Sequence, residues 1–238
     1  AAARVPQIVD ASDRFAVDLY RQLAGETGNF AFSPHSLDMA LRMVWAGSKG
    51  NTAAQMAGVL HADNADPALD AEAADALLRQ MSVFSPFYDL QSANGLFLAP
   101  GQALEQSYID IATGRYYAGL ATVDFAQPKP AANAVNKWIA DHTRGHIANL
   151  VDPNDLVGPT AMVLANAVYL SAWWQHPFAE RDTRDEPFTT SDGRATRAPT
   201  MHQHGHFAYH QTDAAQVLVM RYQGDALSMM FILPRAAD

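Results

Sequence analysis

The sequence predicts an α+β fold, with helices first and strands later. Apolar residues recur at helical spacing in the N-terminal part, whereas short apolar runs typical of strands succeed one another from Glu186 onward. No linker rich in Pro and Ser interrupts the 238 residues, so we expect a single domain, 1–238, without an internal boundary. Hydrophobic residues make up 49% of the chain and charged residues 17%, a composition that allows a sizeable core.

The first predicted helix covers residues 12–25, and its apolar face consists of Phe15, Leu19, Tyr20 and Leu23. We expect a short strand at 29–33 to lead into a second helix at 35–47. Ser33 is a favourable residue at a helix N-cap, and Pro34 suits the first helical position. The side chains expected to face inward from this second helix are Leu37, Leu41 and Val44.

A third helix is expected at 51–60, where Thr52 and Gln55 have the spacing of a capping box. An acidic, alanine-rich helix follows at 70–82. Two later helices are expected at 104–119 and 131–145, the second with Val135, Trp138 and Ile139 near one face. Strands are expected at 90–99, 120–126, 160–174, 186–190, 201–209, 216–222 and 227–233.

The last predicted strand, 227–233, is apolar except for Ser228, which is typical of a strand buried in a sheet. Such a strand needs partners on its edges, because unpaired backbone N–H and C=O groups are costly away from water. Pro234 then ends the apolar pattern. By itself, this strand is expected to leave an unpaired, aggregation-prone edge.

The chain is acidic, with a formal net charge of −9 and only 16 lysines and arginines. This charge argues against nucleic acid, heparin-like polyanions or anionic membranes as partners. The longest apolar stretch, 161–174, is interrupted by Asn166 and Ser171 and is shorter than the roughly 20 residues of a membrane span. The chain begins with Ala1 and shows no signal peptide, which suggests processing or trimming.

The motifs of hydrolytic enzymes are missing from the sequence. It contains no cysteine, no G-x-S-x-G elbow and no H-E-x-x-H motif, so we expect no disulfide, no catalysis and no cofactor. The segment His-Gln-His-Gly-His raises one separate hypothesis. If it is a strand, His202, His204 and His206 point to one side, where three imidazoles can hold zinc or copper or act as a pH switch. No carboxylate or cysteine adjoins them, and the plainer interpretation is a solvent-facing strand without metal.

Residues 29–60 resemble the opening of the serpins, the serine protease inhibitor family. The motifs that carry this likeness are Ser33-Pro34-His35-Ser36, the turn Gly47–Thr52 and the pair Gln55-Met56. Four later stretches are also similar to the family: 94–98 to strand two of sheet A, 135–151 to helix F, 164–188 to strand three of sheet A with the W-x-x-P-F motif, and 217–234 to the central hairpin of sheet B. The resemblance covers nearly the whole chain.

The resemblance implies a serpin fold, with an N-terminal helical region, a large mixed β-sheet A and parts of sheets B and C. A serpin continues with further strands of sheets A and B and with the exposed reactive loop, and none of these is in this chain. We therefore expect a fragment, or a piece that a separate C-terminal serpin chain completes. The reactive bond is not in this chain, so the residue beside that bond, which selects the target protease, lies outside the sequence.

The implied function is inhibition of a serine or cysteine protease as a suicide substrate, by insertion of the cleaved reactive loop into sheet A. One alternative is a non-inhibitory serpin, acting as a carrier, chaperone or storage protein, and another is an inactive truncation product. The acidic helix 70–82 lacks the basic cluster of heparin-activated serpins, so no heparin dependence is expected. The expected location is extracellular or periplasmic, with the cytoplasm as the alternative.

The resemblance assigns Ser33, Ser36 and Asn166 to the shutter, which controls the opening of sheet A. It assigns Trp174 to the breach, where insertion begins, although residues 171–173 depart from the family's K-G-K pattern. A buried Asn in an apolar strand needs hydrogen-bond partners, and we expect the two hydroxyls to provide them. The plainer interpretations are a helix N-cap for Ser33, a satisfied polar core residue for Asn166 and core packing for Trp174.

Overall fold

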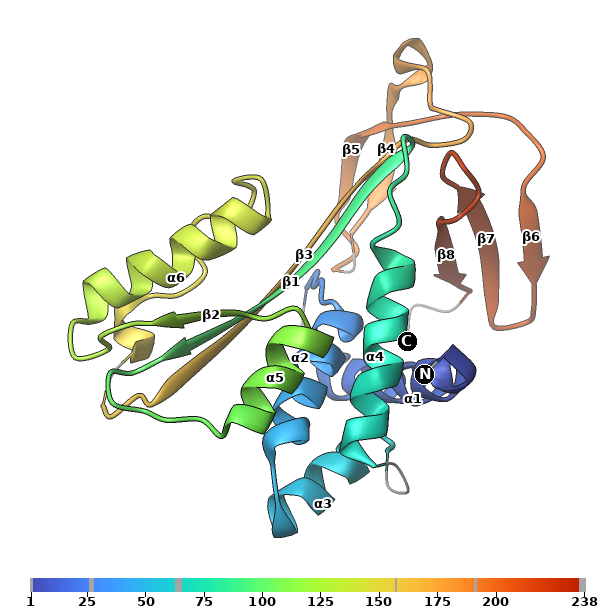
Figure 1. The fold of residues 1–238 in the computed structure, drawn as a ribbon. Helices are drawn as coiled ribbons and strands as arrows, with labels where there is room; N and C mark the ends of the chain where they lie inside the picture. Colours follow the sequence, from blue (N-terminus) through green and yellow to red (C-terminus); the bar gives the residue numbers. More distant parts are fainter. Residues whose placement is uncertain (1, 26–27, 63–65, 157, 191, 236–238) are drawn as a thin grey trace. The chain divides into compact units, whose positions relative to one another are not determined.

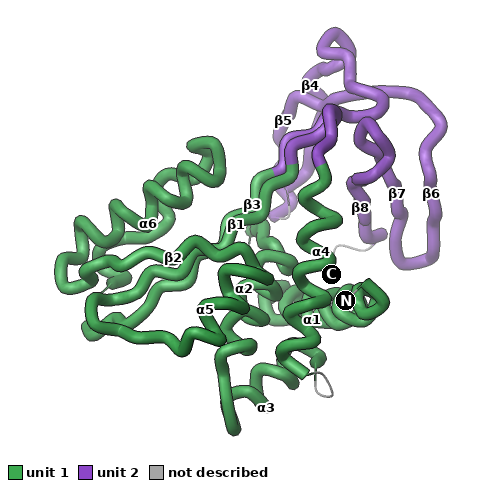
Figure 2. The backbone as a smooth tube through the Cα atoms, in the orientation of Figure 1, with its two compact units in different colours: residues 1–83, 90–169 green, residues 84–89, 170–238 purple. Residues whose placement is uncertain are grey.

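The structure, a computed structural model, describes residues 2–25, 28–62, 66–156, 158–190 and 192–235. The chain forms two compact units (Figures 1 and 2). Unit 1 comprises Ala1–Val83 with Leu90–Tyr169, and unit 2 comprises Phe84–Asp89 with Leu170–Asp238. The ends of the predicted domain, residue 1 and residues 236–238, lie outside the described residues, and its unity stays a prediction.

The described part of unit 1 contains the six α-helices that the sequence predicts and two short 3-10 helices that it does not predict. They are η1 (Ala2–Arg4), α1 (Val5–Leu23), α2 (Pro34–Gly47), α3 (Gly50–Val59), α4 (Pro67–Met81), α5 (Gln106–Arg115), α6 (Pro128–His142) and η2 (Pro153–Leu156). The strand predicted at 29–33 is wrong, because these residues have no regular structure. The capping box is wrong as well. Since α3 starts at Gly50, Thr52 already lies inside its first turn, and the N-cap residue Lys49 makes no side-chain hydrogen bond.

The buried faces of the first two long helices differ from the predicted ones. In α1 the buried residues are Ile8, Ala11 and Phe15, whereas Tyr20 is 54% exposed. In α2 the side chain of Leu37 is exposed, while Asp38 and Arg42 are completely buried. Apolar spacing alone therefore selected the wrong side of α2, because two charged residues occupy its buried face.

Pairing of charges explains the burial of Arg42. Its Nε donates to Asp38 over 2.8 Å, its Nη1 to Asp70 on α4 over 2.7 Å, and its Nη2 to the carbonyl oxygen of Leu60 over 3.2 Å. The hydroxyl of Ser12 on α1 also donates to Asp38, over 2.5 Å. A buried guanidinium is tolerated when its N–H groups are bonded and its charge is opposed. This cluster joins α1, α2 and α4.

The sheet of unit 1 consists of β1 (Tyr88–Leu98), β2 (Gly119–Thr122) and β3 (Met162–Ala172), in the order β2-β1-β3. Strands β1 and β2 are parallel, with Gly95 opposite Gly119 and Leu98 opposite Thr122. The first residues of β1 and the last residues of β3 belong to unit 2.

Within unit 1 the sheet lies between two layers of helices, with α6 on one face and the bundle containing α2, α4 and α5 on the other (Figure 1). Successive side chains alternate between these layers, as a pleated strand requires. Leu96 packs with the bundle, whereas Phe97 packs with Val135 and Ile139 of α6. Burial on both faces explains why β1 ends in a continuous apolar stretch.

Unit 2 consists of η3 (Glu180–Asp182), β4 (Arg184–Thr189), β5 (Ala195–Thr200), β6 (Ala208–Gln211), β7 (Ala215–Arg221) and β8 (Ser228–Pro234). Strands β4 and β5 form an antiparallel hairpin, and β6-β7-β8 form an antiparallel sheet. The turn between β7 and β8 contains Gly224 and Asp225, with φ angles of 84° and 58°. Glycine adopts this left-handed conformation without steric cost.

Two predictions fail in unit 2. Residues 201–207 have no regular structure, so the strand predicted at 201–209 begins only at Ala208. Strand β8 is present, but its side chains are exposed rather than buried, with Ile232 at 63% and Leu233 at 62%. Its apolar residues Met229, Met230 and Phe231 are also exposed, at 41%, 59% and 44%. Among the described residues, every helix is too short or too polar to span a bilayer.

Candidate functional site

Ser33 and Ser36 lie at the start of α2, where the extended backbone of Ser33 turns into the helix at Pro34. The Oγ atom of Ser33 accepts a hydrogen bond from the backbone N–H of Ser36 over 3.2 Å and from the Ser36 hydroxyl over 2.9 Å. The first bond is that of an N-cap, which satisfies one of the free N–H groups of the first turn. The N-cap interpretation of Ser33 is confirmed.

Asn166 lies on β3, and its partner is another asparagine. Its Nδ2 donates to Oδ1 of Asn94 on β1 over 2.8 Å, and Nδ2 of Asn94 donates to the carbonyl oxygen of Tyr116 over 2.8 Å. Asn94 is 2% exposed. The two amides therefore form a polar chain across β1 and β3, ending on the backbone that follows α5. The Oδ1 atom of Asn166 is buried and has no hydrogen-bond partner among the described residues.

The expected network of Ser33, Ser36 and Asn166 is not formed as predicted. The two hydroxyls bond to each other, and the amide of Asn166 bonds to Asn94 instead of to a hydroxyl. The sequence did contain the signal for Asn94, which is the polar residue directly before the apolar run Gly95–Leu98. When two neighbouring strands each contribute an Asn, the two side-chain amides can form a hydrogen bond with each other. Whether they meet depends on which strands are neighbours in the sheet. The assignment of these residues to a shutter stays a prediction.

Helix α6 contacts the sheet at two glycines. A Cβ atom at Gly95 would lie 3.1 Å from the indole of Trp138, and one at Gly119 would lie 3.3 Å from it. The indole also meets the ring of Phe97 edge-on, with centroids 5.8 Å apart. Because both glycines lack side chains, they leave the space that the indole occupies above β1 and β2. The imidazole of His142 packs against the other side of Trp138, with centroids 4.2 Å apart.

The segment after α6 returns to β3 through an aromatic contact. His146 stacks on Tyr169 with centroids 5.5 Å apart, and the guanidinium of Arg144 lies 5.7 Å from the centre of the same ring. Such cation–π contacts stabilise by about 0.5–1 kcal/mol at exposed sites. Helix α6 thus contacts the sheet through Trp138, and the segment that follows the helix contacts β3 at Tyr169.

In unit 2, Trp174 stacks on Tyr222, with ring centroids 4.4 Å apart and planes inclined by 13°. Their backbones form an isolated antiparallel bridge. On either side of this bridge, Gln175 N donates to Arg221 O over 2.9 Å and Gln223 N donates to Trp173 O over 2.8 Å. Tyr222 is 8% exposed. Trp174 thus packs on Tyr222 but is only half-buried, and its assignment to the core or to the breach stays a prediction.

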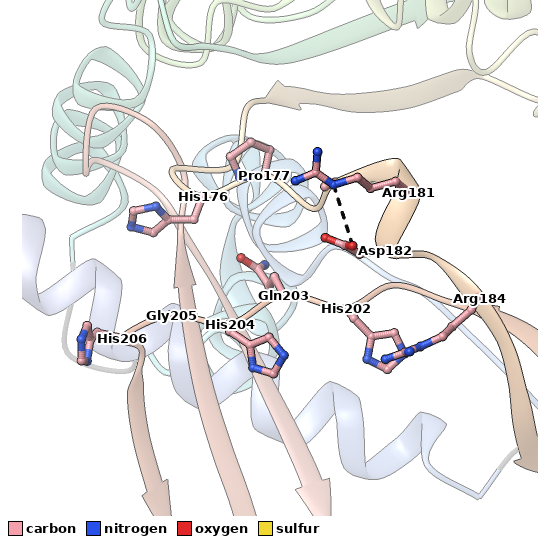
Figure 3. Close-up of a pocket in the computed structure, with 11 residues that line it drawn as sticks. His176, Pro177, Arg181, Asp182, Arg184, His202, Gln203, His204, Gly205 and His206 are labelled. Atoms are coloured by element: carbon pink, nitrogen blue, oxygen red, sulfur yellow. Dashed lines mark ion pairs between the residues drawn. The ribbon is translucent and has the colours of Figure 1, made fainter.

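The histidine segment does not have the geometry expected for a metal site. Because residues 201–207 are irregular, His202, His204 and His206 are not held on one side of a strand (Figure 3). Within the described ranges, no group of three His, Asp or Glu side chains is arranged to hold a metal ion. His202 contacts a carboxylate instead, with Nε2 at 3.0 Å from Oε1 of Glu186. The prediction that a strand places these three histidines on one side, where they could hold zinc or copper, is therefore wrong.

Comparison with known proteins finds one family across most of the chain. A family model described as Serpin (serine protease inhibitor) matches residues 10–238. An uncharacterized serpin-like protein from Thermococcus kodakarensis is 37% identical over 229 residues, which are 96% of this chain and 53% of that protein. Leukocyte elastase inhibitor from Equus caballus is 33% identical over 96% of this chain and 61% of that protein.

Solved structures agree with these relatives. The crystal structure of serine protease inhibitor (serpin)-12 from Manduca sexta matches with a TM-score of 0.89 and 30% identity, over 96% of this chain and 64% of that one. The chain therefore spans between about half and about two thirds of the length of the proteins it matches.

Proposed function

Because the chain belongs to the serpin family of serine protease inhibitors, we propose that the protein inhibits a serine or cysteine protease as a suicide substrate. Its α+β fold is the serpin fold, as predicted from the sequence motifs. The chain spans only 53% to 64% of the matched relatives, so the reactive loop is proposed to belong to the part of the family's domain that these 238 residues do not span. In this proposal the protein is not an enzyme.

The observation that carries the proposal is the open edge of β3. In the sheet order β2-β1-β3, this 11-residue strand has a strand neighbour on one side only among the described residues. The backbone groups on its other side can pair with an added strand. About ten new ladder hydrogen bonds, each worth ~1 kcal/mol net, would stabilise the inserted state by on the order of 10 kcal/mol.

The proposed mechanism starts with attack of the protease on the reactive loop, which forms an acyl-enzyme. Insertion of the freed loop beside β3 then carries the bound protease with it and distorts the catalytic groups of the protease. Loss of one oxyanion-hole donor slows acyl chemistry by about 10²–10³. Distortion of several such groups would therefore stall deacylation and leave the protease covalently trapped.

The residues of the candidate site would govern how readily the sheet accepts a strand. The bond between Asn166 and Asn94 ties β3 to β1, and α6 rests on β1 and β2 through Trp138. We propose that Ser33 and Ser36 support this region from the start of α2. In the same proposal, Trp174, fixed on Tyr222, marks the end of β3 where insertion begins.

The test is incubation of the full-length gene product with a trypsin-like and an elastase-like protease, followed by SDS gel electrophoresis and intact-mass analysis. We expect an adduct that survives denaturation and whose mass equals protease plus cleaved inhibitor. The matched control is the same protease with its active-site serine chemically blocked, which should form no adduct. Clean cleavage without an adduct would contradict the proposal and favour a non-inhibitory carrier, chaperone or storage protein.

A further inference from the structure

Unit 2 contains a cavity of about 680 Å³, which is lined by residues from 176–184 and 202–206. Its lining is rich in nitrogen donors (Figure 3). These donors belong to His176, Arg181, Arg184, His202, His204 and His206. Only one acidic side chain, Asp182, lines the same space.

The charge of this lining is opposite to that of the whole chain, whose formal net charge is −9. The lining has two arginines and one aspartate, and Glu186 beside it balances the second arginine when the imidazoles are neutral. Arg181 and Asp182 are 4.0 Å apart with an exposed guanidinium, so this contact neutralises little. Glu186, which is not in the lining, lies 3.4 Å from Arg184 and 3.0 Å from His202. Glu186 thus lies close to both of these donors.

Gln203 supplies a second, independent observation. Its side chain lies at the centre of the group in Figure 3. Its Nε2 is buried and has no hydrogen-bond partner among the described residues. A buried amide N–H without an acceptor is rare in a folded protein, and its presence calls for an explanation such as a missing ligand.

We propose that this cavity binds a small oxyanion, either a carboxylate or a tetrahedral group such as a phosphoryl group. Guanidinium, imidazolium and amide N–H groups are all donors, and charged donors bind oxyanions with short, strong hydrogen bonds. A metal ion would instead need converging neutral imidazoles and carboxylates, and the described residues offer no such group. The site is separate from protease inhibition and does not depend on it.

Binding should depend on pH, because histidine side chains in general change charge between pH 5 and 8. The other charged groups that face these imidazoles are Arg181, Asp182, Arg184 and Glu186. A protonated imidazole carries the charge that favours an oxyanion, so binding should be tighter at the pH where more of the imidazoles are protonated.

The test is an NMR titration of the full chain with sulfate and, separately, with acetate, at pH 6 and pH 8. The charge of both probes is constant over this range, so a change in affinity reports on the protein. We expect saturable shifts of the imidazole signals of His202, His204 and His206. We expect sulfate binding to be about tenfold tighter at pH 6 than at pH 8. Tighter binding of sulfate would indicate a tetrahedral ligand, and equal or tighter binding of acetate would indicate a carboxylate.

Variants locate the site. Gln203→Ala removes the buried amide, and His204→Ala changes an exposed residue that should not affect folding. Each is expected to weaken sulfate binding about fivefold to tenfold. The matched control is His210→Ala, because His210 lies on β6 outside the lining and is exposed. Absence of saturable binding, shifts of His210 as large as those of the lining histidines, or unchanged affinity in both test variants would overturn the proposal.

Discussion

The side-chain amide of Asn166 on β3 donates a hydrogen bond to the side-chain oxygen of Asn94 on β1, over 2.8 Å. The strand with the open edge is thereby joined to its inner neighbour by side chains as well as by the backbone ladder. The partner of Asn94 beyond this bond is the backbone of Tyr116. Separation of β1 from β3 would leave the side-chain N–H of Asn166 and the side-chain oxygen of Asn94 without each other.

Replacement of Asn94 by alanine should lower the free energy of unfolding by about 1–3 kcal/mol, because Nδ2 of Asn166 and the carbonyl oxygen of Tyr116 lose their partner. Urea denaturation measures this change. In a double-mutant cycle with Asn166→Ala, the two effects should be non-additive by about 0.5–3 kcal/mol. The control is Asn154→Ala, whose side chain is exposed. Additive single effects would contradict the bond.

Gly95→Ala should destabilise the fold by about 1–3 kcal/mol, because the added methyl group would overpack the contact with α6. Its Cβ would lie 2.9 Å from the ring of Phe97 and 3.1 Å from Trp138. The matched control is Gly114→Ala on α5, where a Cβ meets nothing within 4 Å. That exposed helical substitution should stabilise by about 0.5–1 kcal/mol. Thermal unfolding of both variants measures whether each substitution lowers or raises stability. A change in the same direction for both variants would contradict the close approach of Gly95 to Phe97 and Trp138.

Arg42→Met should lower stability by about 3–5 kcal/mol, because it leaves the carboxylates of Asp38 and Asp70 buried without their cation. Both carboxylates are already short of donors, since one oxygen of each is buried and without a hydrogen bond in the described residues. Arg14→Met is the control, because Arg14 pairs with Asp10 on the exposed side of α1. Its effect should stay below about 1 kcal/mol in chemical denaturation. Similar losses in the two variants would argue against the buried cluster.

Stability should fall with acidification partly through His35. Burial lowers the pKa of His35, although the nearby charge of Asp38 opposes this shift. Between the lowered folded pKa and the ordinary value of 6.5, the unfolded state binds more protons than the folded state. The contribution is therefore fully present above pH 6.5 and is lost as the pH falls toward the folded pKa.

The measurement is the difference in unfolding free energy between the wild type and His35→Gln at pH 8 and pH 5. We expect His35→Gln to lose less stability than the wild type on acidification. His210→Gln, at an exposed position on β6, should follow the wild type. A parallel loss in His35→Gln and the wild type would exclude His35 as the titrating group.

The adjacent tryptophans provide a matched pair in unit 2. Trp174→Ala removes the ring that stacks on Tyr222, whereas Trp173 is 71% exposed. We expect Trp174→Ala to lower the urea midpoint by an amount equivalent to about 1–3 kcal/mol, because burial and stacking are both lost. Trp173→Ala should stay within about 0.5 kcal/mol of the wild type. Equal effects would show that the stack contributes no stability.

Local patterns predicted most of the helices and strands, because helical spacing and apolar runs depend on neighbouring residues. Helix α6, with Val135 and Ile139 buried, and the N-cap at Ser33 are examples. The failures at α2 and at Asn166 are non-local. The face of α2 depends on Asp70, which is 28 positions from Arg42, and the partner of Asn166 is 72 positions away.

The sequence alone determined three properties, because all of them are read along the chain. These are the order of the elements, the acidic character of the chain and the motifs of the serpin family. Only the tertiary structure decided which charges are buried, which asparagines pair and that the residues around His204 form a cavity wall instead of a strand. The physical reason is that the burial of a charge or an amide depends on the partner that satisfies it. Such a partner comes from whichever element the fold brings alongside.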